Sequence, residues 1–564
     1  MVSFPRRTAV FASGSQMVPR FLRHVFPDLP LRAQISSTSN TCYLVMWTRS
    51  SKMNIVEQVP CTPSERAKGQ AVYAIEKTPH DVADLFEAGA LREGGAPNVW
   101  SRQHIGLLMQ YAAVGMIHGT LSGTVYPFFL NYLNMEGTQV VSARVLLNLP
   151  WSFKVFYGLL SDCVPIFGYR RRPFMLIGWT VCFFMLLVMA CMDAGDPYYP
   201  DRKYAHVNPA TLNPEIVATF NTSARQNGAK FIVAMMLATV GCVGADVAAD
   251  AVVVELAQRE PEAVRGTTQT TIYMVRTIFV TLSAVLTGVA FNGKDYGGDF
   301  DFSISFPQLM LILCLCCLPV LPITWFFIKE EKHAGVNVRE YMASFWELLQ
   351  QQPVYQVIAY SFFSGIFAKF TATCLEPMQA TWAGSTPFND KVMEMVGHSI
   401  FALTIFCIGK HGLHWNWRLM VLITAVAVVV MDSMGNEGAV YGLLSTVNNL
   451  AAPFASTLSK NVDAKFDVKN EDIVLDSTHV RWEVTYVLLI RYAANLMALL
   501  FLPLLPKQKA QTQELKRKGV SSRVLGAITV AYLVFALFWS VMVNVMSIYP
   551  ATACLKLVGG SGCK

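Results

Sequence analysis

The sequence predicts an all-α polytopic membrane protein with two six-helix bundles and about 12 transmembrane segments. Three observations lead to this class. Of the 564 residues, 53% are hydrophobic and only 15% are charged, whereas soluble domains contain about 25% charged residues. Apolar runs long enough to cross a bilayer follow one another from residue 104 onward. A charged connection divides these runs into two sets of six, so the chain has two halves.

The apolar runs define five segments. Residues 1–100 form a polar N-terminal tail, 101–328 the N-terminal transmembrane bundle, 329–352 a central cytoplasmic loop, 353–548 the C-terminal transmembrane bundle and 549–564 a C-terminal tail. The helices predicted for the first bundle are at about 104–130, 140–162, 173–192, 230–256, 266–291 and 304–328. Those predicted for the second are at about 354–376, 395–409, 418–434, 438–458, 482–505 and 524–547.

The N-terminal tail is basic over its first 56 residues. It carries arginines and lysines such as Arg6 and Lys52 against the single acid Asp28, together with many serines. This is the composition of an organellar transit peptide. A basic arm, or a true start at Met53, explains the same residues, so both interpretations stay open.

Basic residues between the apolar runs predict the orientation. With the N-terminal tail inside, the turns at Arg170–Arg172 and Arg259–Arg265 and the loop after Lys329 all fall inside, as the positive-inside rule requires. The loop from Asp193 to Ala229 then falls outside. It contains Asn221-Thr222-Ser223, which makes Asn221 a candidate glycosylation site.

The second half conflicts with this count. Counting onward places the strip Lys507–Arg523 outside, although its six lysines and arginines face one acid, Glu514. The positive-inside rule predicts that the strip is cytoplasmic. One missing helix near Asp432–Gly438, lost through a deletion or a gene-model error, would add a membrane crossing and place the strip inside. A tolerated exception to the charge rule is the alternative.

Composition also excludes several functions. The net charge of +7 comes from short loops that set orientation, so we expect no nucleic-acid partner. The 13 cysteines lie mostly inside apolar runs, without metal-ligand spacing or an extracellular disulfide framework. No nucleophile elbow, metal box or phosphate loop is present in the sequence, so we expect no enzyme, no metal and no cofactor.

Ionisable residues inside the predicted helices are the candidate functional residues, because a charge at membrane depth is costly and usually lines a polar path. Asp246 and Asp250 are four residues apart, which places both carboxylates on one helix face among small residues. Arg276 lies near mid-membrane and needs an anion, from these carboxylates or from a substrate. Lys154 is about two turns from Asp162 and could either snorkel to the cytoplasmic side or take part in the site.

The loop after the second predicted helix resembles the signature loop of the major facilitator superfamily. The matching residues are Gly158-Leu-Leu-Ser-Asp162 followed by Gly168-Tyr-Arg-Arg-Arg172, with a few extra residues between Asp and Gly. The resemblance implies that Asp162, Arg170, Arg171 and Arg172 belong to the gate of a two-bundle transporter. Mutation there should disturb gating more than binding.

A longer string is similar to the folate-biopterin transporter family. It consists of Asn148, Pro150-Trp151, Lys154, Gly158, Ser161-Asp162, Pro165, Phe167 to Pro173 and Asp246-Val-Ala-Ala-Asp250-Ala. The resemblance covers residues 100–505 and is stronger in the first half; the helix after Arg523 is an addition to the family pattern.

The family resemblance implies proton-driven uptake of folates or pterins by alternating access. It implies that Asp246 and Asp250 bind the pterin or the proton, and that Arg276 and Lys154 serve anion recognition or charge pairing. We expect a monomer in the lipid bilayer, in the plasma membrane more than in an organellar membrane. Two alternatives stay open: a transporter of another charged metabolite, such as an S-adenosyl compound or amino acid, and a degenerate membrane protein that transports nothing.

Overall fold

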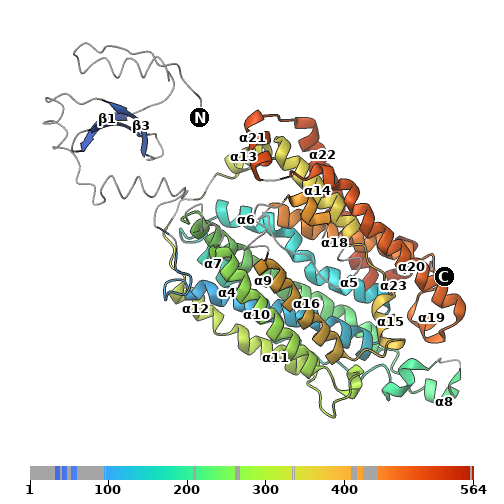
Figure 1. The fold of residues 1–564 in the computed structure, drawn as a ribbon. Helices are drawn as coiled ribbons and strands as arrows, with labels where there is room; N and C mark the ends of the chain where they lie inside the picture. Colours follow the sequence, from blue (N-terminus) through green and yellow to red (C-terminus); the bar gives the residue numbers. More distant parts are fainter. Residues whose placement is uncertain are drawn as a thin grey trace. The chain divides into compact units, whose positions relative to one another are not determined.

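The computed structural model describes most of the chain after residue 97. The described residues are 32–38, 41–47, 53–59, 95, 97–207, 211–260, 267–332, 335, 337–407, 416–422, 443–507, 509–558, 560 and 562–563. The chain divides into two compact units, residues 1–87 and 88–564. The second unit holds all the described helices (Figure 1).

The first unit contains a small antiparallel sheet. Its strands are β1 (Arg32–Thr38), β2 (Thr41–Trp47) and β3 (Met53–Val59), in the order β1-β2-β3. Two residues separate β1 from β2, the length of a tight hairpin connection. The sequence analysis predicted a polar tail here and did not predict these strands.

The N-terminal bundle begins with α4 (Ile105–Gly123), which continues into η2 (Val125–Tyr132). The second span is made of three pieces, α5 (Gly137–Asn148), η3 (Leu149–Phe153) and α6 (Lys154–Cys163). Pro150 lies in η3, where its missing N–H interrupts the α-helical hydrogen bonds. The remaining helices are α7 (Arg172–Cys191), α9 (Ala224–Ala257), α10 (Thr267–Ala290), α11 (Phe306–Cys317) and α12 (Val320–Phe327), with the short η4 (Arg202–His206), α8 (Pro214–Val217) and η7 (Lys294–Tyr296) in the loops.

Helices α7 and α9 are in backbone contact through glycine. A Cβ atom on Gly178 would lie 2.5 Å from the carbonyl oxygen of Gly241, and a Cβ on Gly241 would lie 2.5 Å from the carbonyl oxygen of Gly178. Small residues permit such close approach between membrane helices. The small residues predicted along this part of α9 therefore have a packing role, and they fix the helix that carries Asp246.

The C-terminal half follows a central connection that contains α13 (Val338–Gln350). Its membrane helices are α14 (Gln352–Ala368), α16 (Pro387–Cys407), α18 (Leu443–Asp463), α20 (Thr478–Met497) with η9 (Ala498–Leu504), and α22 (Arg523–Ile548). Shorter elements are α15 (Leu375–Thr381), α19 (Asn470–Leu475), α21 (Lys509–Lys518), α23 (Pro550–Ala553) and η10 (Lys556–Val558).

The helices confirm the predicted helical, multi-pass membrane architecture. Six helices in the described part of the chain are long and apolar enough to cross a membrane without further assumptions, α7, α9, α10, α11 with α12, α20 with η9, and α22. The two halves pack on each other through α10 against α16 and through the second span against α18. Helix α22 contacts both α18 and α5, so it touches both halves (Figure 1).

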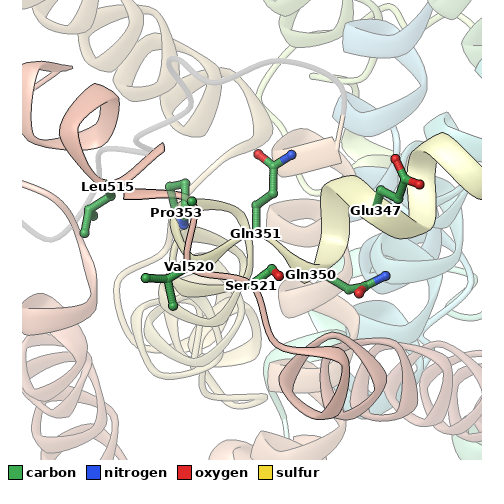
Figure 2. A pocket seen from close by; sticks show the side chains of 8 residues that line it. Glu347, Gln350, Gln351, Pro353, Leu515, Val520 and Ser521 are labelled. Atoms are coloured by element: carbon green, nitrogen blue, oxygen red, sulfur yellow. The ribbon is translucent and has the colours of Figure 1, made fainter. Parts of the chain in front are cut away.

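The basic strip lies on the same side of the bundle as the central loop. The backbone N–H of Gln352 donates to Val520 O at 3.0 Å, and the N–H of Ser522 donates to Gln350 O at 2.9 Å. Figure 2 shows the pocket of about 330 Å³ that forms where Gln351 and Pro353 meet Leu515 and Val520. The count that placed the strip outside was therefore wrong, and the positive-inside expectation for it agrees with the structure.

The number of membrane crossings was miscounted in the C-terminal half. Helix α18 begins on the inner side and ends on the outer side, where Asp463 accepts hydrogen bonds from the N–H and hydroxyl of Thr373 at 2.7 and 2.8 Å. Helix α20 then returns to the inner side, ahead of the basic strip. The missing helix predicted near Asp432–Gly438 lies outside the described residues, as does most of the predicted segment at 418–434.

The C-terminal segment corrects the expectation that the chain has no disulfide framework. Cys554 and Cys563 form a disulfide beyond the outer end of α22. Disulfides form and persist in oxidising compartments.

We expect the C-terminus to face outward in cells. Helix α22 starts beside the inner central loop and ends on the outer side, so an epitope tag after Lys564 should bind antibody on intact expressing cells. A tag before Met1 should bind only after permeabilisation. Flow cytometry of both tagged forms measures this, and exposure of the N-terminal tag alone would contradict the orientation.

Candidate functional site

A buried ion cluster joins the second span to α9. The ammonium of Lys154 donates to Asp246 Oδ2 and to Asp250 Oδ2, each at 2.8 Å. Asp246 is fully buried and Lys154 is 9% exposed. The hydroxyl of Tyr111, from α4, donates to Asp250 Oδ1 at 2.6 Å. Three membrane helices therefore supply one hydrogen-bonded charge cluster.

Local structure explains why these groups meet. Lys154 is the first residue of α6, directly after the η3 turn that contains Pro150. On α9, residues four apart lie on the same face, so one ammonium can reach both carboxylates. Burial of an ion is tolerated in a membrane protein when it is paired and hydrogen-bonded, and here one cation is shared by two anions.

A tryptophan links this cluster to Arg276. The Nζ atom of Lys154 lies 4.7 Å from the centroid of the Trp151 ring. The guanidinium carbon of Arg276, from α10, lies 4.7 Å from the same centroid. The His118 ring packs edge-on against Trp151 at 5.1 Å between centroids. Cation–π contacts are strongest on Trp and strengthen when desolvated, so Trp151 brings both cations into one site.

Three buried polar atoms of this cluster have no hydrogen-bond partner among the described residues. They are Asp246 Oδ1, the indole Nε1 of Trp151 and Nδ1 of His118. Unpaired polar atoms are rare in protein interiors because each costs free energy. An acceptor, a donor and an imidazole nitrogen of the cluster are thus left without a protein partner among the described residues. The pocket in Figure 2 is lined by other residues, at the inner surface.

The structure brings all four predicted site residues together. Lys154, for which snorkelling and a site role were both open, is at the centre and does not snorkel. Tyr111 and His118 were not predicted from the sequence, and Trp151 was included only as part of a motif. Spacing held one usable signal, because Trp151 and Lys154 are three residues apart and so share a helix face. The sequence contains no signal for Tyr111, which comes from a distant helix.

Two of the predicted gate residues, Asp162 and Arg171, form a second ion network at the inner ends of the helices. The guanidinium of Arg171 pairs with Asp162 Oδ1 at 2.7 Å and with Glu255 Oε1 at 3.7 Å. It also donates to the hydroxyl of Ser161 at 2.8 Å. Arg171 is 8% exposed. This network ties the end of α6 to the start of α7 and to the end of α9.

In the described part of the chain, the side chains of Arg170 and Arg172 do not take part in this ion network. The backbone N–H groups of Arg170, Arg171 and Arg172 donate to the carboxylate of Glu330, at 2.6, 2.9 and 2.8 Å. A carboxylate at a helix N-terminus binds its free N–H groups and complements the helix dipole. The Arg172 side chain stacks on Tyr169, with its guanidinium carbon 4.5 Å from the ring centroid. The two acidic partners, Glu255 and Glu330, were not predicted from the sequence.

Several polar contacts between the two halves lie on the outer side. Arg144 of α5 forms an ion pair with Glu376 of α15 at 2.5 Å. The hydroxyl of Tyr126 donates to the carbonyl oxygen of Ser385 at 3.3 Å, and the Asn470 amide donates to Met135 O at 3.1 Å. These pairs hold the outer ends of the two halves together.

Asn221 lies in the outer loop between α7 and α9, where its side chain is partly exposed. Its amide donates to the carbonyl oxygen of Asp196 at 3.0 Å, and its Oδ1 accepts from Ser223 Oγ at 2.6 Å. Glycosylation at this residue stays a prediction.

Solved structures similar to this chain include transporters of two kinds. A D-xylose-proton symporter matches with a TM-score of 0.38 and 14% identity, covering 77% of this chain and 96% of that one. A bacterial homologue of the human lysosomal transporter Spinster, in an inward-facing and unoccupied conformation, matches with a TM-score of 0.39 and 11% identity, covering 79% and 98%.

Two curated relatives match parts of the chain. Probable folate-biopterin transporter 4 of Arabidopsis thaliana is 22% identical over 165 residues, which are 29% of this chain and 28% of the relative. Folate transporter 1 of Plasmodium falciparum is 40% identical over 43 residues, 8% of each chain. The matches thus span less than a third of either relative. The BT1 family model matches residues 114–199, which include the second span and the gate loop. The resemblance to the folate-biopterin transporter family that the sequence predicted is therefore confirmed, and α4 to α7 carry it.

Proposed function

We propose that this protein is a secondary active transporter of folates or pterins, coupled to protons and working by alternating access. The observation that carries the proposal is the buried cluster of Lys154, Asp246, Asp250, Trp151 and Arg276. Ionisable groups at membrane depth are costly and mark substrate or ion pathways. The names of the two curated relatives support the same class of cargo.

The chemistry of the cluster suits a pterin. A carboxylate can accept two parallel hydrogen bonds from the exocyclic amino group and adjacent ring nitrogen of a pterin. Asp246 Oδ1, which lacks a partner among the described residues, offers such an acceptor. The Trp151 ring offers a stacking surface, and Arg276 a cation for the glutamate carboxylates of folate.

The same groups support proton coupling. The single positive charge of Lys154 offsets at most one of the two carboxylates, Asp246 and Asp250, that it bridges. A ligand that draws Lys154 away from both carboxylates leaves them facing each other without that cation, and protonation of one carboxylate relieves their repulsion. Substrate and proton would then bind together, as symport requires.

The contacts between the halves support alternating access. The outer ion pair of Arg144 with Glu376 and the nearby hydrogen bonds close the outer side. Two bundles that rock about a central site would break these contacts when the outer side opens. The outward position of the disulfide and of Asn221 supports the plasma membrane as the site of action.

Uptake measurements test the proposed cargo. Cells expressing the chain should accumulate labelled folate or biopterin, and both Asp246→Asn and Arg276→Ala should lose at least nine-tenths of the rate at equal surface expression. Lys230→Gln is the matched control, because Lys230 is exposed on α9 and its ammonium contacts the Asp193 carbonyl oxygen and the Phe231 ring, away from the cluster. Wild-type rates in both variants would refute the site. A panel with S-adenosyl compounds and amino acids would reveal a different cargo.

A further inference from the structure

A second lysine is buried where the two halves meet on the outer side. Lys460 of α18 is fully buried. Its ammonium donates to Ser142 Oγ of α5 and to Asn544 Oδ1 of α22, each at 2.6 Å, and to Ser547 Oγ of α22 at 3.3 Å. Among the described residues, no carboxylate is within 4.0 Å of this ammonium.

The three partners are arranged as acceptors only. Ser142 donates its own hydrogen to Thr138 O at 2.7 Å, and Ser547 donates to Val543 O at 2.9 Å. The Asn544 amide nitrogen donates to Ser540 O at 2.8 Å, which turns its oxygen toward the lysine. Three acceptors match the three N–H donors of an ammonium. Each N–H of a protonated Lys460 therefore has an acceptor on a neighbouring helix.

The positions of these residues link the Lys460 site to the relative movement of the two halves. Ser142 belongs to the N-terminal half, Lys460 to the C-terminal half, and Asn544 and Ser547 to α22, the helix that the family resemblance does not include. One ammonium thus joins both halves through the added helix. If the outer ends of α5 and α18 separate, the bond to Ser142 must break while the two bonds to α22 can persist.

We propose that Lys460 and α22 form an outer latch, in which the bond from Lys460 to Ser142 stabilises the conformation that is closed to the outside. This inference rests on the alternating access of the proposed function but not on its cargo. Helix α22 then has a direct role in the latch, because it orients the ammonium and supplies two of its three acceptors. Loss of the bond to Ser142 shifts the population toward the outward-open state.

Thiol labelling tests the latch without any substrate. The reporter is Tyr126→Cys, a buried position whose native side chain contacts Ser385 of the other half on the outer side. The background carries Cys191→Ser, because Cys191 is exposed at the outer end of α7. A membrane-impermeant maleimide added to intact cells reports how often the reporter becomes accessible.

Ser142→Ala should raise the labelling rate about tenfold, the effect expected from loss of one hydrogen bond to a charged group. Lys460→Met should raise it at least as much. Ser540→Ala is the matched control, since it removes a buried hydroxyl of α22 that has no partner among the described residues and keeps the carbonyl that orients Asn544. The control should label at the parent rate.

Two results would overturn the latch. One is an unchanged labelling rate in Ser142→Ala at normal surface expression, which would mean that the bond does not influence the opening. The other is an equal increase in Ser142→Ala and Ser540→Ala, which would assign the effect to general packing of α22. Because Ser142→Ala removes a single oxygen, it keeps the test valid even if Lys460→Met fails to fold. Failure of folate uptake with a working latch would refute the cargo alone.

Discussion

Lys154→Met should abolish uptake and lower the thermal stability of the purified protein. The substitution keeps the length of the side chain but leaves Asp246 and Asp250 facing each other without the ammonium that each contacts at 2.8 Å. Removing one partner of a buried ion pair typically costs about 3–5 kcal/mol, because the remaining charge is uncompensated. Uptake assays and thermal unfolding in detergent measure the two effects.

A double substitution separates stability from transport. Lys154→Met combined with Asp250→Asn removes one cation and one anion, so it should regain part of the lost stability while transport stays absent. Lys230→Met, at an exposed position on α9, should change neither property. If Lys154→Met alone transported at the wild-type rate, the cluster would be a structural ion pair and no part of the path.

The sequence predicted the membrane class well because the bilayer imposes strict rules. Long apolar runs must be helices, since lipid offers no hydrogen bonds to a bare backbone. The basic residues of Arg170–Arg172 then gave the orientation. The same rule exposed the inconsistency at Lys507–Arg523, where counting helices failed and charge was the better guide. The three strands before residue 60 follow no such rule and were missed.

The site could be predicted only in part, because its residues come from four different spans. The spacing of Asp246 and Asp250 on one helix was readable from the sequence, and so was the cost of burying Arg276. Tyr111 was not, since it approaches α9 only through tertiary packing, and Lys154 was predicted with snorkelling left open as an alternative. Lys154 lies at the centre of the site because of the η3 turn at Pro150. The spacing of residues in the sequence does not show how this turn directs the side chain.

The cysteines and lysines of the C-terminal part illustrate a second limit. Cys554 and Cys563 follow the last apolar run, and composition alone grouped them with the membrane cysteines. Lys460 is near the end of α18, where an ordinary lysine would reach the interface. Its burial became visible only when α5 and α22 were placed beside it. Both features lie on elements whose packing cannot be determined from sequence patterns.

Arg171→Met should slow transport strongly with little effect on the apparent affinity for the substrate. Arg171 contacts Asp162, Glu255 and Ser161 at the inner ends of the helices, away from the Lys154 cluster. Losing a multiply bonded buried cation costs several hydrogen bonds to charged groups, each worth about 1.5–3 kcal/mol. We expect the maximal uptake rate to fall at least tenfold, with KM changed by less than about twofold.

Arg170→Met is the matched control for this prediction. Glu330 binds the backbone N–H groups of the arginine turn, and these survive any side-chain substitution. The Arg170 variant should therefore retain most of the maximal rate, whereas Arg171→Lys should be impaired because an ammonium cannot reproduce the planar fork that meets Asp162 and Ser161. A rise in KM at an unchanged maximal rate in Arg171→Met would place Arg171 in substrate binding, and equal losses in both methionine variants would show that the turn needs positive charge alone.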